Sequence, residues 1–248
     1  MTGILLDIAT AFQFLTRLPL AWLPWREDTL RRSASYFPLV GMAVGFSAAG
    51  IHRLLSSHLP AAAVALLIVL FMTLLTGGMH EDGLADVADG FGGGRERTQV
   101  LAIMKDSRIG SYGALAIVFS LASRILLLAS LPAERFVAYL VSAEVLSRWT
   151  VLPLGAFLAS ARQEVSLGAR IARQVSISSL IAGTVLALAP VAWLLRETAW
   201  TACLSALLVA VCTGLYYWRR LDGITGDCCG ATIQLAAISI YLCGAWRP

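Results

Sequence analysis

Residues 77–94, GGMHEDGLADVADGFGGG, gather acidic side chains in a chain of 248 residues of which only 14% are charged. Asp82, Asp86 and Asp89 are four and three residues apart, so a helix would place their carboxylates on one face, about 5 to 6 Å from one another. Such carboxylates repel unless a cation lies between them, and oxygen ligands without thiolates favour Mg²⁺. We therefore predict that these three aspartates bind Mg²⁺. In the alternative, the segment is a solvated acidic loop in which Asp82 caps a helix.

A second polar segment, KDSRIGSYG at residues 105–113, combines cations and hydroxyls with glycines whose backbone amides can approach an anion closely. It follows the glycine-rich GFGGGR, but the G-K-[ST] ending of a P-loop is absent. We predict that this segment binds phosphate oxygens, together with an arginine in the segment FLTRLP at residues 14–19. The predicted phosphate-binding residues are Arg17, Lys105, Ser107, Arg108 and Gly110. The alternative is a flexible interfacial loop with snorkelling basic side chains.

Three residues are candidates for acid–base chemistry or for binding the metal. Asp106 lies inside the predicted phosphate-binding segment, His80 precedes Asp82 by two residues, and Asp227 lies in LDGITGD at residues 221–227. Asp227 could equally cap the last helix, as could Thr225. His80 could equally have no chemical role.

An acidic cluster, cations and glycine-rich loops together favour Mg²⁺-dependent transfer of a phosphate-linked group, in which the protein mainly positions the reactants and neutralises charge. A membrane transporter is one alternative, although transporter sites usually lie at the bilayer midplane on broken helices. A CDP-alcohol-type phosphotransferase is the other, because DVADG matches the start of that family's motif. The rest of that motif is absent after Asp89.

The elements that carry these residues are predicted to be membrane-spanning helices. The chain is 58% hydrophobic, and its apolar segments reach the roughly 18 residues needed to cross a bilayer as a helix. Because backbone amides in lipid must be satisfied within the segment, we predict an all-α, polytopic bundle that forms a single domain over residues 1–248. About seven transmembrane helices are expected, near residues 34–55, 61–79, 113–131, 134–154, 176–195, 199–218 and 229–246.

Before these spans, the first twenty residues place apolar side chains on one side of a helix and polar side chains on the other. This pattern predicts an amphipathic helix lying in the membrane interface. Charges inside the spans are costly in hydrocarbon, so Arg124, Glu144 and Arg148 are predicted to face the bundle interior. Glu144 and Arg148 are four residues apart and are expected to pair. GMAVG at residues 41–45 has the small-xxx-small form of closely packed helices.

The distribution of Lys and Arg predicts the orientation. Thirteen of the 19 fall in the segments on one side of the predicted spans and four on the other. The positive-inside rule then puts the amino terminus in the cytoplasm and the carboxyl terminus outside, with all the polar segments described above at the cytoplasmic face. The net charge of +4 follows from this topology and predicts no nucleic-acid partner.

Five segments resemble one known family along nearly the whole chain. FLTRLP, FPLVG, TGGMHEDGLADVADG, IMKDSRIGSYG and ITGDCCGA occur here in the order typical of cobalamin synthases, the adenosylcobinamide-GDP ribazoletransferases of bacteria and archaea. This resemblance implies a multi-pass enzyme of the cell inner membrane that uses Mg²⁺. It implies that adenosylcobinamide-GDP reacts with α-ribazole, or with α-ribazole 5′-phosphate, to give adenosylcobalamin or its 5′-phosphate plus GMP. The sequence leaves open whether the protein forms a homo-oligomer or associates with other cobalamin-biosynthesis enzymes.

Overall fold

The computed structural model describes residues 3–20, 32–162 and 175–246. These residues form helices and connecting segments, with no β-strand and one isolated bridge between Ser160 and Ile224. The predicted all-α fold is therefore confirmed. The α-helices are α1 (Gly3–Leu15), α3 (Phe37–Leu55), α4 (Ala61–Thr76), α5 (Met79–Gly93), α6 (Arg97–Ile103), α7 (Ser111–Ser130), α8 (Ala133–Trp149), α9 (Val151–Phe157), α11 (Ile177–Leu195), α12 (Ala199–Leu221) and α13 (Gly226–Ala245). Short 3₁₀ turns, Ala34–Tyr36 and Arg196–Thr198, precede α3 and α12.

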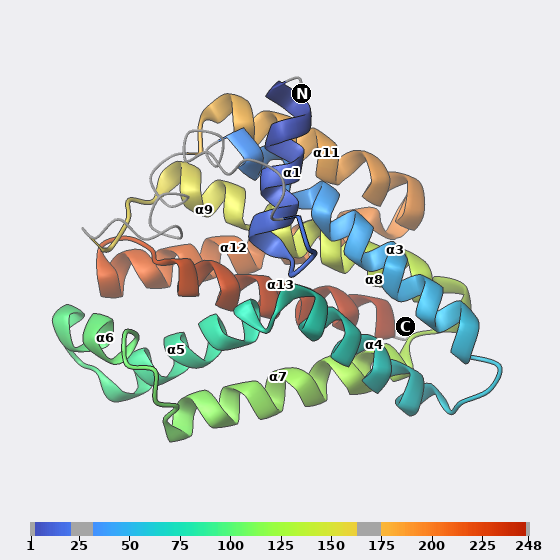
Figure 1. The fold of residues 1–248 in the computed structure, drawn as a ribbon, viewed down its shortest axis with the longest axis horizontal. Helices are drawn as coiled ribbons and strands as arrows, with labels where there is room; N and C mark the ends of the chain where they lie inside the picture. Colours follow the sequence, from blue (N-terminus) through green and yellow to red (C-terminus); the bar gives the residue numbers. More distant parts are fainter. Residues whose placement is uncertain (1–2, 21–31, 163–174, 247–248) are drawn as a thin grey trace.

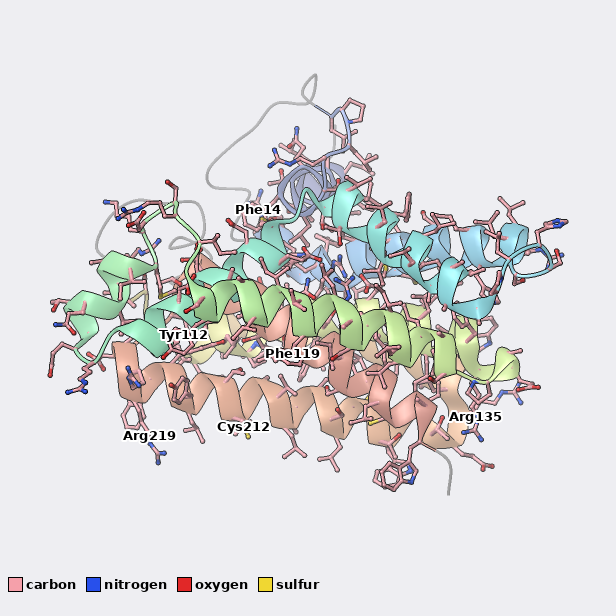
Figure 2. The ribbon with its side chains drawn as sticks, turned by 90° about the horizontal axis from the view of Figure 1, so that it is seen from below. Phe14, Tyr112, Phe119, Arg135, Cys212 and Arg219 are labelled. Atoms are coloured by element: carbon pink, nitrogen blue, oxygen red, sulfur yellow. The ribbon has the colours of Figure 1, made fainter. Side chains whose placement is uncertain are left out.

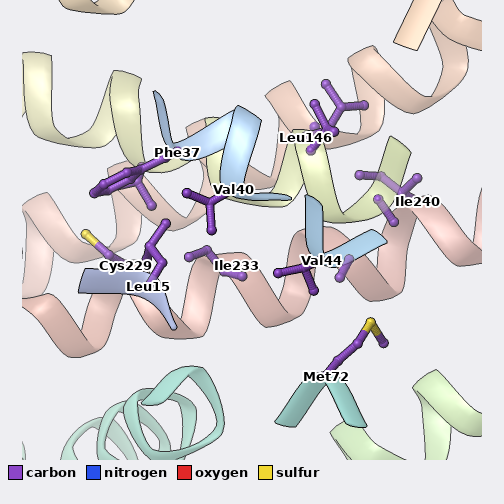
Figure 3. Close-up of a cluster of buried hydrophobic side chains, with 14 of the residues drawn as sticks. Leu15, Phe37, Val40, Val44, Met72, Leu146, Cys229, Ile233 and Ile240 are labelled. Atoms are coloured by element: carbon purple, nitrogen blue, oxygen red, sulfur yellow. The ribbon is translucent and has the colours of Figure 1, made fainter. Parts of the chain in front are cut away.

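The interior of the bundle is built around α8 and α13, which run between the other long helices (Figure 1). Side chains of α1, α3, α4, α8 and α13 lie in one apolar cluster, which includes Phe37, Val44, Met72, Leu146 and Ile240 (Figure 3). All five of these side chains are almost completely buried. Because α8 and α13 are surrounded by other helices, most of their side chains contact protein and need not be apolar enough to face lipid.

Helix α3 packs closely on α8 through the glycines of GMAVG. A Cβ atom on Gly41 would overlap the backbone carbonyl of Glu144, and one on Gly45 would lie 2.8 Å from Cα of Val141. No side chain larger than hydrogen fits at either position without moving the helices apart. The small-residue packing predicted from the sequence is thus confirmed.

A sharp bend separates α4 from α5. The two helices meet at 88°, and the residues between them, Gly77 and Gly78, both have φ of 71°, in the left-handed region that favours glycine. The backbone N–H of Arg17 donates to the carbonyl of Leu75 at 2.7 Å, and the Arg17 side chain lies against Gly77. The segment predicted as one span at 61–79 therefore ends as a helix at Thr76, and α5 continues in a new direction.

Fewer segments qualify as membrane-crossing helices than the seven predicted. Four described stretches are long and apolar enough: Ala34–Leu55, Ser111–Ser130, Ile177–Leu221, which contains α11 and α12, and Gly226–Ala245. The bent pair α4 and α5 brings the number to five if it is taken as one span. Helix α8, also a predicted span, has only 17 residues and carries Glu144 and Arg148 in its interior-facing surface.

Exposed aromatic residues support contact with a membrane at two levels. Trp193, Trp200 and Trp246 are each more than 65% exposed, near the α11–α12 turn and the end of α13. At the other end of the bundle, Trp218 and Tyr112 are both 54% exposed. Trp200 and Trp218 are separated by 18 residues of the continuous helix α12, or about 27 Å. This spacing is close to the roughly 30 Å thickness of a bilayer core, whose boundaries are typically lined with Trp and Tyr.

Between those levels the surface is apolar. Figure 2 shows Arg219 and Tyr112 toward one end of the bundle and Arg135 at the other, with Phe119 and Cys212 between them. Phe119 is 67% exposed, and α7, α11 and α12 carry many further exposed apolar side chains. An exposed apolar band of this extent is expected of a protein whose helices face lipid.

The predicted N-terminal helix is present as α1, and its polar side faces the protein. Asp7 and Thr10 are buried, and Asp7 forms an ion pair with Arg32 at 3.0 Å, whereas Ile4 and Leu5 are more than half exposed. An apolar outer face is consistent with a helix in contact with the membrane. With 13 residues, α1 is too short to cross it.

Candidate active site

The acidic helix α5 crosses the start of α13 at very short range. A Cβ atom on Gly83 would lie 2.9 Å from the carbonyl oxygen of Asp227, and one on Gly230 would lie 3.3 Å from Cα of His80. Two glycines therefore allow the two backbones to touch. This crossing brings Asp82 and Asp86, on α5, next to Asp227, on α13, although some 140 residues separate them in the sequence.

The charges at this crossing are mostly negative. The carboxylate of Asp86 is subject to repulsion from those of Asp227, Asp82 and Asp89, and Arg162 is the cation that opposes it. Asp227 is paired: its Oδ2 lies 3.2 Å from Nη2 of Arg162 and accepts a hydrogen bond from the Thr225 hydroxyl at 3.2 Å. By contrast, among the described residues the carboxylates of Asp82 and Asp86 have neither a hydrogen-bond nor an ion-pair partner.

Arg162 was not identified from the sequence. It binds Asp227 and also donates to the carbonyl of Met104 at 3.2 Å, and both partners lie more than 50 residues away in the chain. No local spacing marks it out, and in the sequence it contributed only to the count of basic residues that predicts the orientation. Only the folded structure shows that Arg162 lies close enough to Asp227 to balance the charge of the acidic cluster.

Asp89 differs from the prediction, because its carboxylate is already used. Its two oxygens accept hydrogen bonds from the backbone N–H groups of Gly110, at 2.7 Å, and Gly113, at 2.8 Å. The first N–H groups of a helix have no partner within it, so Asp89 satisfies the start of α7. Within the described ranges, no three His, Cys, Asp or Glu side chains are grouped closely enough to hold a metal ion. The described residues therefore contain no ready-made metal site of three aspartates, and metal binding by Asp82 and Asp86 stays a prediction.

The segment 105–113 forms the exposed connection into α7. Asp106 and Arg108 pair with each other, with Arg108 Nη2 2.6 Å from Asp106 Oδ2. The hydrogen bonds from Arg108 lower the pKa of Asp106 to about 2, so this carboxylate stays ionised near neutral pH and is a weak proton acceptor. Lys105, Ser107, Arg108 and Gly110 are all exposed at this rim.

A cavity of about 340 Å³ opens beside the acidic crossing. Asp82, Asp227 and Arg162 form its charged part, and His80 lines it as well. The rest of the wall is mainly apolar and comes from α1, α3, α5, α9 and α13: Phe14, Leu15, Phe37, Met79, Val151, Cys229 and Ile233. Residues of the 105–113 segment are not part of this lining. A mostly apolar pocket with a few convergent polar groups is the usual form of a small-molecule site.

Arginine side chains hold the loops that form the charged part of the cavity. Arg97 donates from Nε to the carbonyl of Leu221 at 2.7 Å and from Nη2 to that of Ala161 at 2.8 Å. Backbone hydrogen bonds between Ile224 and both Ala159 and Ala161, each 2.8 Å, form the isolated bridge. These contacts fix the segment before Arg162 beside the segment before Asp227. Arg17, predicted to bind phosphate, lies instead at the α4–α5 bend, as described above.

Thr225 caps α13, because its hydroxyl accepts from the Cys228 N–H at 3.3 Å. Asp227 is thus available for its ion pair with Arg162. His80 is buried, and its Nε2 has no hydrogen-bond partner in the described part of the chain.

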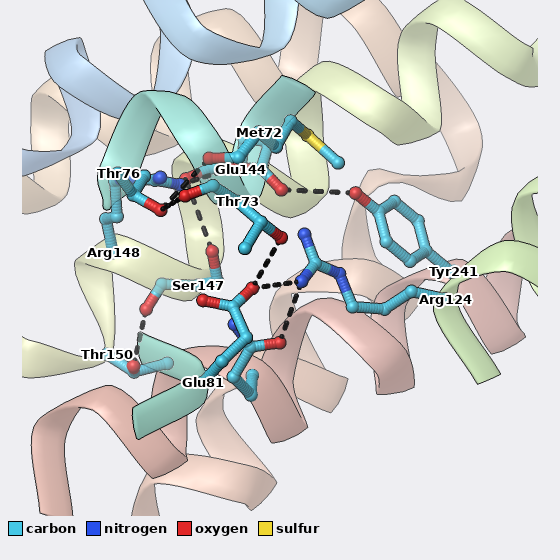
Figure 4. Close-up of polar contacts among 11 residues, drawn as sticks. Met72, Thr73, Thr76, Glu81, Arg124, Glu144, Ser147, Arg148, Thr150 and Tyr241 are labelled. Atoms are coloured by element: carbon cyan, nitrogen blue, oxygen red, sulfur yellow. Dashed lines mark hydrogen bonds and ion pairs between the residues drawn. The ribbon is translucent and has the colours of Figure 1, made fainter. Parts of the chain in front are cut away.

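Two buried ion pairs lie in the interior of the bundle (Figure 4). Arg124 Nη1 is 2.7 Å from Glu81 Oε1, which also accepts from the Thr73 hydroxyl at 3.0 Å. Arg148 Nη1 is 2.6 Å from Glu144 Oε2, as the i, i+4 spacing predicted. The prediction that Arg124, Glu144 and Arg148 face the interior is confirmed. Because Glu81 belongs to α5 and Arg124 to α7, the first pair fixes the helix that carries the acidic cluster against α7.

The family model described as cobalamin-5-phosphate synthase matches residues 7–245, which is nearly the whole chain. The chain belongs to the cobalamin-5-phosphate synthase family. The match covers the acidic helix, the segment 105–113, Arg162 and the start of α13, so every part of the site just described lies inside it.

Individual members of the cobalamin-5-phosphate synthase family are similar over almost their full length. A protein of Azorhizobium caulinodans is 40% identical over 96% of this chain and 95% of its own. Proteins of Polaromonas sp. and Albidiferax ferrireducens are 39% and 38% identical, each over 94% of this chain. All three are named adenosylcobinamide-GDP ribazoletransferase. No solved structure matches the chain.

Proposed function

We propose that this chain is an adenosylcobinamide-GDP ribazoletransferase that joins adenosylcobinamide-GDP to α-ribazole, or to α-ribazole 5′-phosphate, and releases GMP. The observation that carries the proposal is the cavity of about 340 Å³ whose charged part consists of Asp82, Asp227 and Arg162, in a chain of this family. Such a cavity offers an apolar volume for one reactant and charged groups for a phosphate at its edge.

In the proposed reaction, the 3′ hydroxyl oxygen of the ribose bonds to the phosphorus that carries cobinamide, because the 5′ position must stay free to bear the phosphate of α-ribazole 5′-phosphate. The bond from this phosphorus to the bridging oxygen breaks, and GMP leaves with that oxygen. The hydroxyl proton passes to a carboxylate, for which we propose Asp227, because it lines the cavity and is held in place by Arg162 and Thr225. His80 also lines the cavity, and its buried Nε2 has no hydrogen-bond partner among the described residues, so we propose it as the second candidate to accept a proton or to orient the hydroxyl.

Arg162 is proposed to contact the phosphate at the reacting centre. Its guanidinium lies at the cavity wall, and phosphates bind arginine with strong, charge-assisted hydrogen bonds. The exposed Lys105, Ser107, Arg108 and Gly110 form a separate rim outside this cavity. We propose that this rim holds the distal, guanosine-bearing phosphate. For Arg17 we propose only a positioning role, because its contacts lie at the α4–α5 bend.

Magnesium is proposed as the cofactor, with Asp82 and Asp86 as its protein ligands. Both carboxylates lack a partner in the described residues, both present oxygen donors, and both repel Asp227, so a divalent cation would relieve their repulsion. Proteins commonly hold Mg²⁺ through one or two carboxylates plus substrate phosphates and water. When bound, the ion neutralises charge on the phosphate oxygens during transfer. Asp89 fits less well, because it is engaged at the start of α7.

The activity itself is tested with the purified protein in lipid vesicles. Supplied with adenosylcobinamide-GDP, α-ribazole and Mg²⁺, it is expected to release one GMP for each adenosylcobalamin formed, and both products can be quantified by chromatography. A membrane transporter would instead move one of these compounds into sealed vesicles without releasing GMP. A CDP-alcohol-type phosphotransferase would release CMP from a CDP-alcohol and leave adenosylcobinamide-GDP unchanged.

We propose that the active site faces the cytoplasm across the cell inner membrane. Interactions of Arg97, Arg162 and Arg220 connect the loops at the end of the bundle that carries the acidic cluster, and this is the arginine-rich end. Fewer basic residues lie at the other end, where His52 stacks on Phe136. Four arginines of the cytoplasmic count, Arg26, Arg31, Arg170 and Arg173, and one of the opposite count, Arg247, lie outside the described residues.

The orientation predicts opposite results for two reporters fused to the carboxyl terminus of the full chain. Alkaline phosphatase, which is active only outside the cytoplasm, is expected to be active, and green fluorescent protein, which is fluorescent only in the cytoplasm, is expected to stay dark. The same reporters at the amino terminus control for expression, because green fluorescent protein there should fluoresce. A fluorescent carboxyl-terminal fusion without phosphatase activity would mean that the orientation is inverted.

A further inference from the structure

We infer that the apolar part of the 340 Å³ cavity binds the aromatic base of the nucleoside acceptor, and that it favours a base with an apolar edge over a purine. This inference rests on the proposed function, which supplies the nucleoside. It assigns one reactant to one part of the wall, and it makes α1 a determinant of which base is used.

Two nearly parallel aromatic rings form part of the apolar wall. The rings of Phe14, on α1, and Phe37, on α3, lie 5.8 Å apart at the centroids and only 7° from parallel, and both line the cavity. A flat base can continue this offset stack, because stacked aromatic rings attract one another when they are parallel and displaced. Phe37 is almost completely buried, so it fixes the plane to which Phe14 and the base align.

Polar and apolar groups lie in separate regions of the cavity wall. Arg162 and Asp227 are paired with each other and Asp82 is near them, so they form one charged region. Phe14 and Phe37 come from other helices and form an apolar region. A nucleoside bound with its base on the phenylalanines would direct its ribose, and hence the ribose 3′ hydroxyl, toward the carboxylates. This is the orientation that the proposed reaction requires.

The apolar lining disfavours a purine base, and the volume of the cavity disfavours the corrin of the other reactant. A purine such as guanine carries donors and acceptors on its edge, and burying these against Leu15, Val151 and Ile233 would leave them without partners, which is costly. The benzimidazole of α-ribazole has no exocyclic donors or acceptors, so it loses little on entering an apolar cavity. The corrin macrocycle of cobinamide is much larger than a nucleoside and does not fit within about 340 Å³.

The test compares Phe14→Ala with Phe12→Ala in the full-length protein in lipid vesicles. Phe12 lies on the same helix and is also partly buried, but it does not line the cavity. Base stacking on an aromatic side chain typically contributes enough that its removal weakens binding about tenfold or more. We expect Phe14→Ala to raise the KM for α-ribazole by about that factor while the KM for adenosylcobinamide-GDP changes less than about twofold. Phe14→Tyr should restore the KM for α-ribazole, and Phe12→Ala should leave both values unchanged.

Two further measurements make the result decisive. Equilibrium dialysis of labelled α-ribazole, without the second substrate, should show weaker binding to Phe14→Ala than to the wild type, and this readout does not depend on turnover. The wild type should also use α-ribazole at least about tenfold more efficiently, in kcat/KM, than the corresponding α-riboside of adenine. A rise in the KM for adenosylcobinamide-GDP alone, or equal use of both ribosides, would overturn the inference. A wild-type protein that releases no GMP at all would instead contradict the proposed function.

Discussion

Asp86→Asn is expected to lower the rate of GMP release by at least about 100-fold at ordinary Mg²⁺ concentration. Asn has nearly the same shape as Asp but no charge, so the variant removes one of the two α5 carboxylates without a partner among the described residues, and little else. Loss of a single group that stabilises charge in a transition state typically costs a factor of about 10² to 10³. The measurement is GMP release by the purified variant, titrated with MgCl₂, since a weakened metal site would shift the dependence to higher Mg²⁺.

Asp222→Asn is the matched control. Asp222 is an exposed aspartate that ends α12 with φ of 54°, in the left-handed region that Asn also tolerates. Asp222→Asn makes the same change in net charge close to the same loops. The activity and the Mg²⁺ dependence of this variant should stay near those of the wild type. Normal activity of Asp86→Asn at low Mg²⁺ would remove Asp86 from the proposed metal site. Equal loss in both variants would point to a general effect of charge at this end of the bundle.

Arg124→Met is expected to be among the most destabilising single substitutions in the chain. It leaves the carboxylate of Glu81 buried and without its cation, and breaking a buried ion pair by removing one partner typically costs about 3–5 kcal/mol. Glu81→Gln should also be destabilising, because Arg124 then remains as an uncompensated charge. The double variant should recover most of the lost stability, since neither charge is left without its partner.

Thermal unfolding of the four proteins in one detergent gives this comparison. Arg108→Met is the control, because its pair with Asp106 is exposed, and exposed ion pairs contribute little to stability. Its unfolding midpoint should therefore stay close to that of the wild type. A double variant that is less stable than either single variant would show that the pair acts through something other than mutual neutralisation, such as the hydrogen bonds to Thr73 and Gln234.

Local sequence patterns predicted the elements of this fold well. Long apolar runs identified the helices, and the small residues of GMAVG identified the contact between α3 and α8, because both depend on the side chains within one segment. The pairing of Glu144 with Arg148 followed from helical spacing alone. The bend at Gly77 and Gly78 was missed, since the apolar run continues through it and only the backbone conformation divides it into two helices.

The candidate site was predictable only in part. Helical spacing grouped Asp82, Asp86 and Asp89 correctly on one helix, but it could not reveal that the amides of Gly110 and Gly113 occupy Asp89. Likewise, Arg124 was predicted to face inward without its partner, because Glu81 lies on another helix. Contacts of this kind depend on how helices cross. A single sequence records the residues at a crossing but not the crossing itself.

The crossing of α5 and α13 has one more electrostatic consequence. Met79 and His80, in the first turn of α5, and Gly226 and Asp227, in the first turn of α13, all line the cavity, so two helices begin at its wall. Each helix start carries a partial positive charge from its aligned peptide dipoles. The two dipoles therefore offset part of the negative charge of the aspartates. An acceptor that already bears a 5′-phosphate would thus meet less repulsion there than a count of carboxylates suggests.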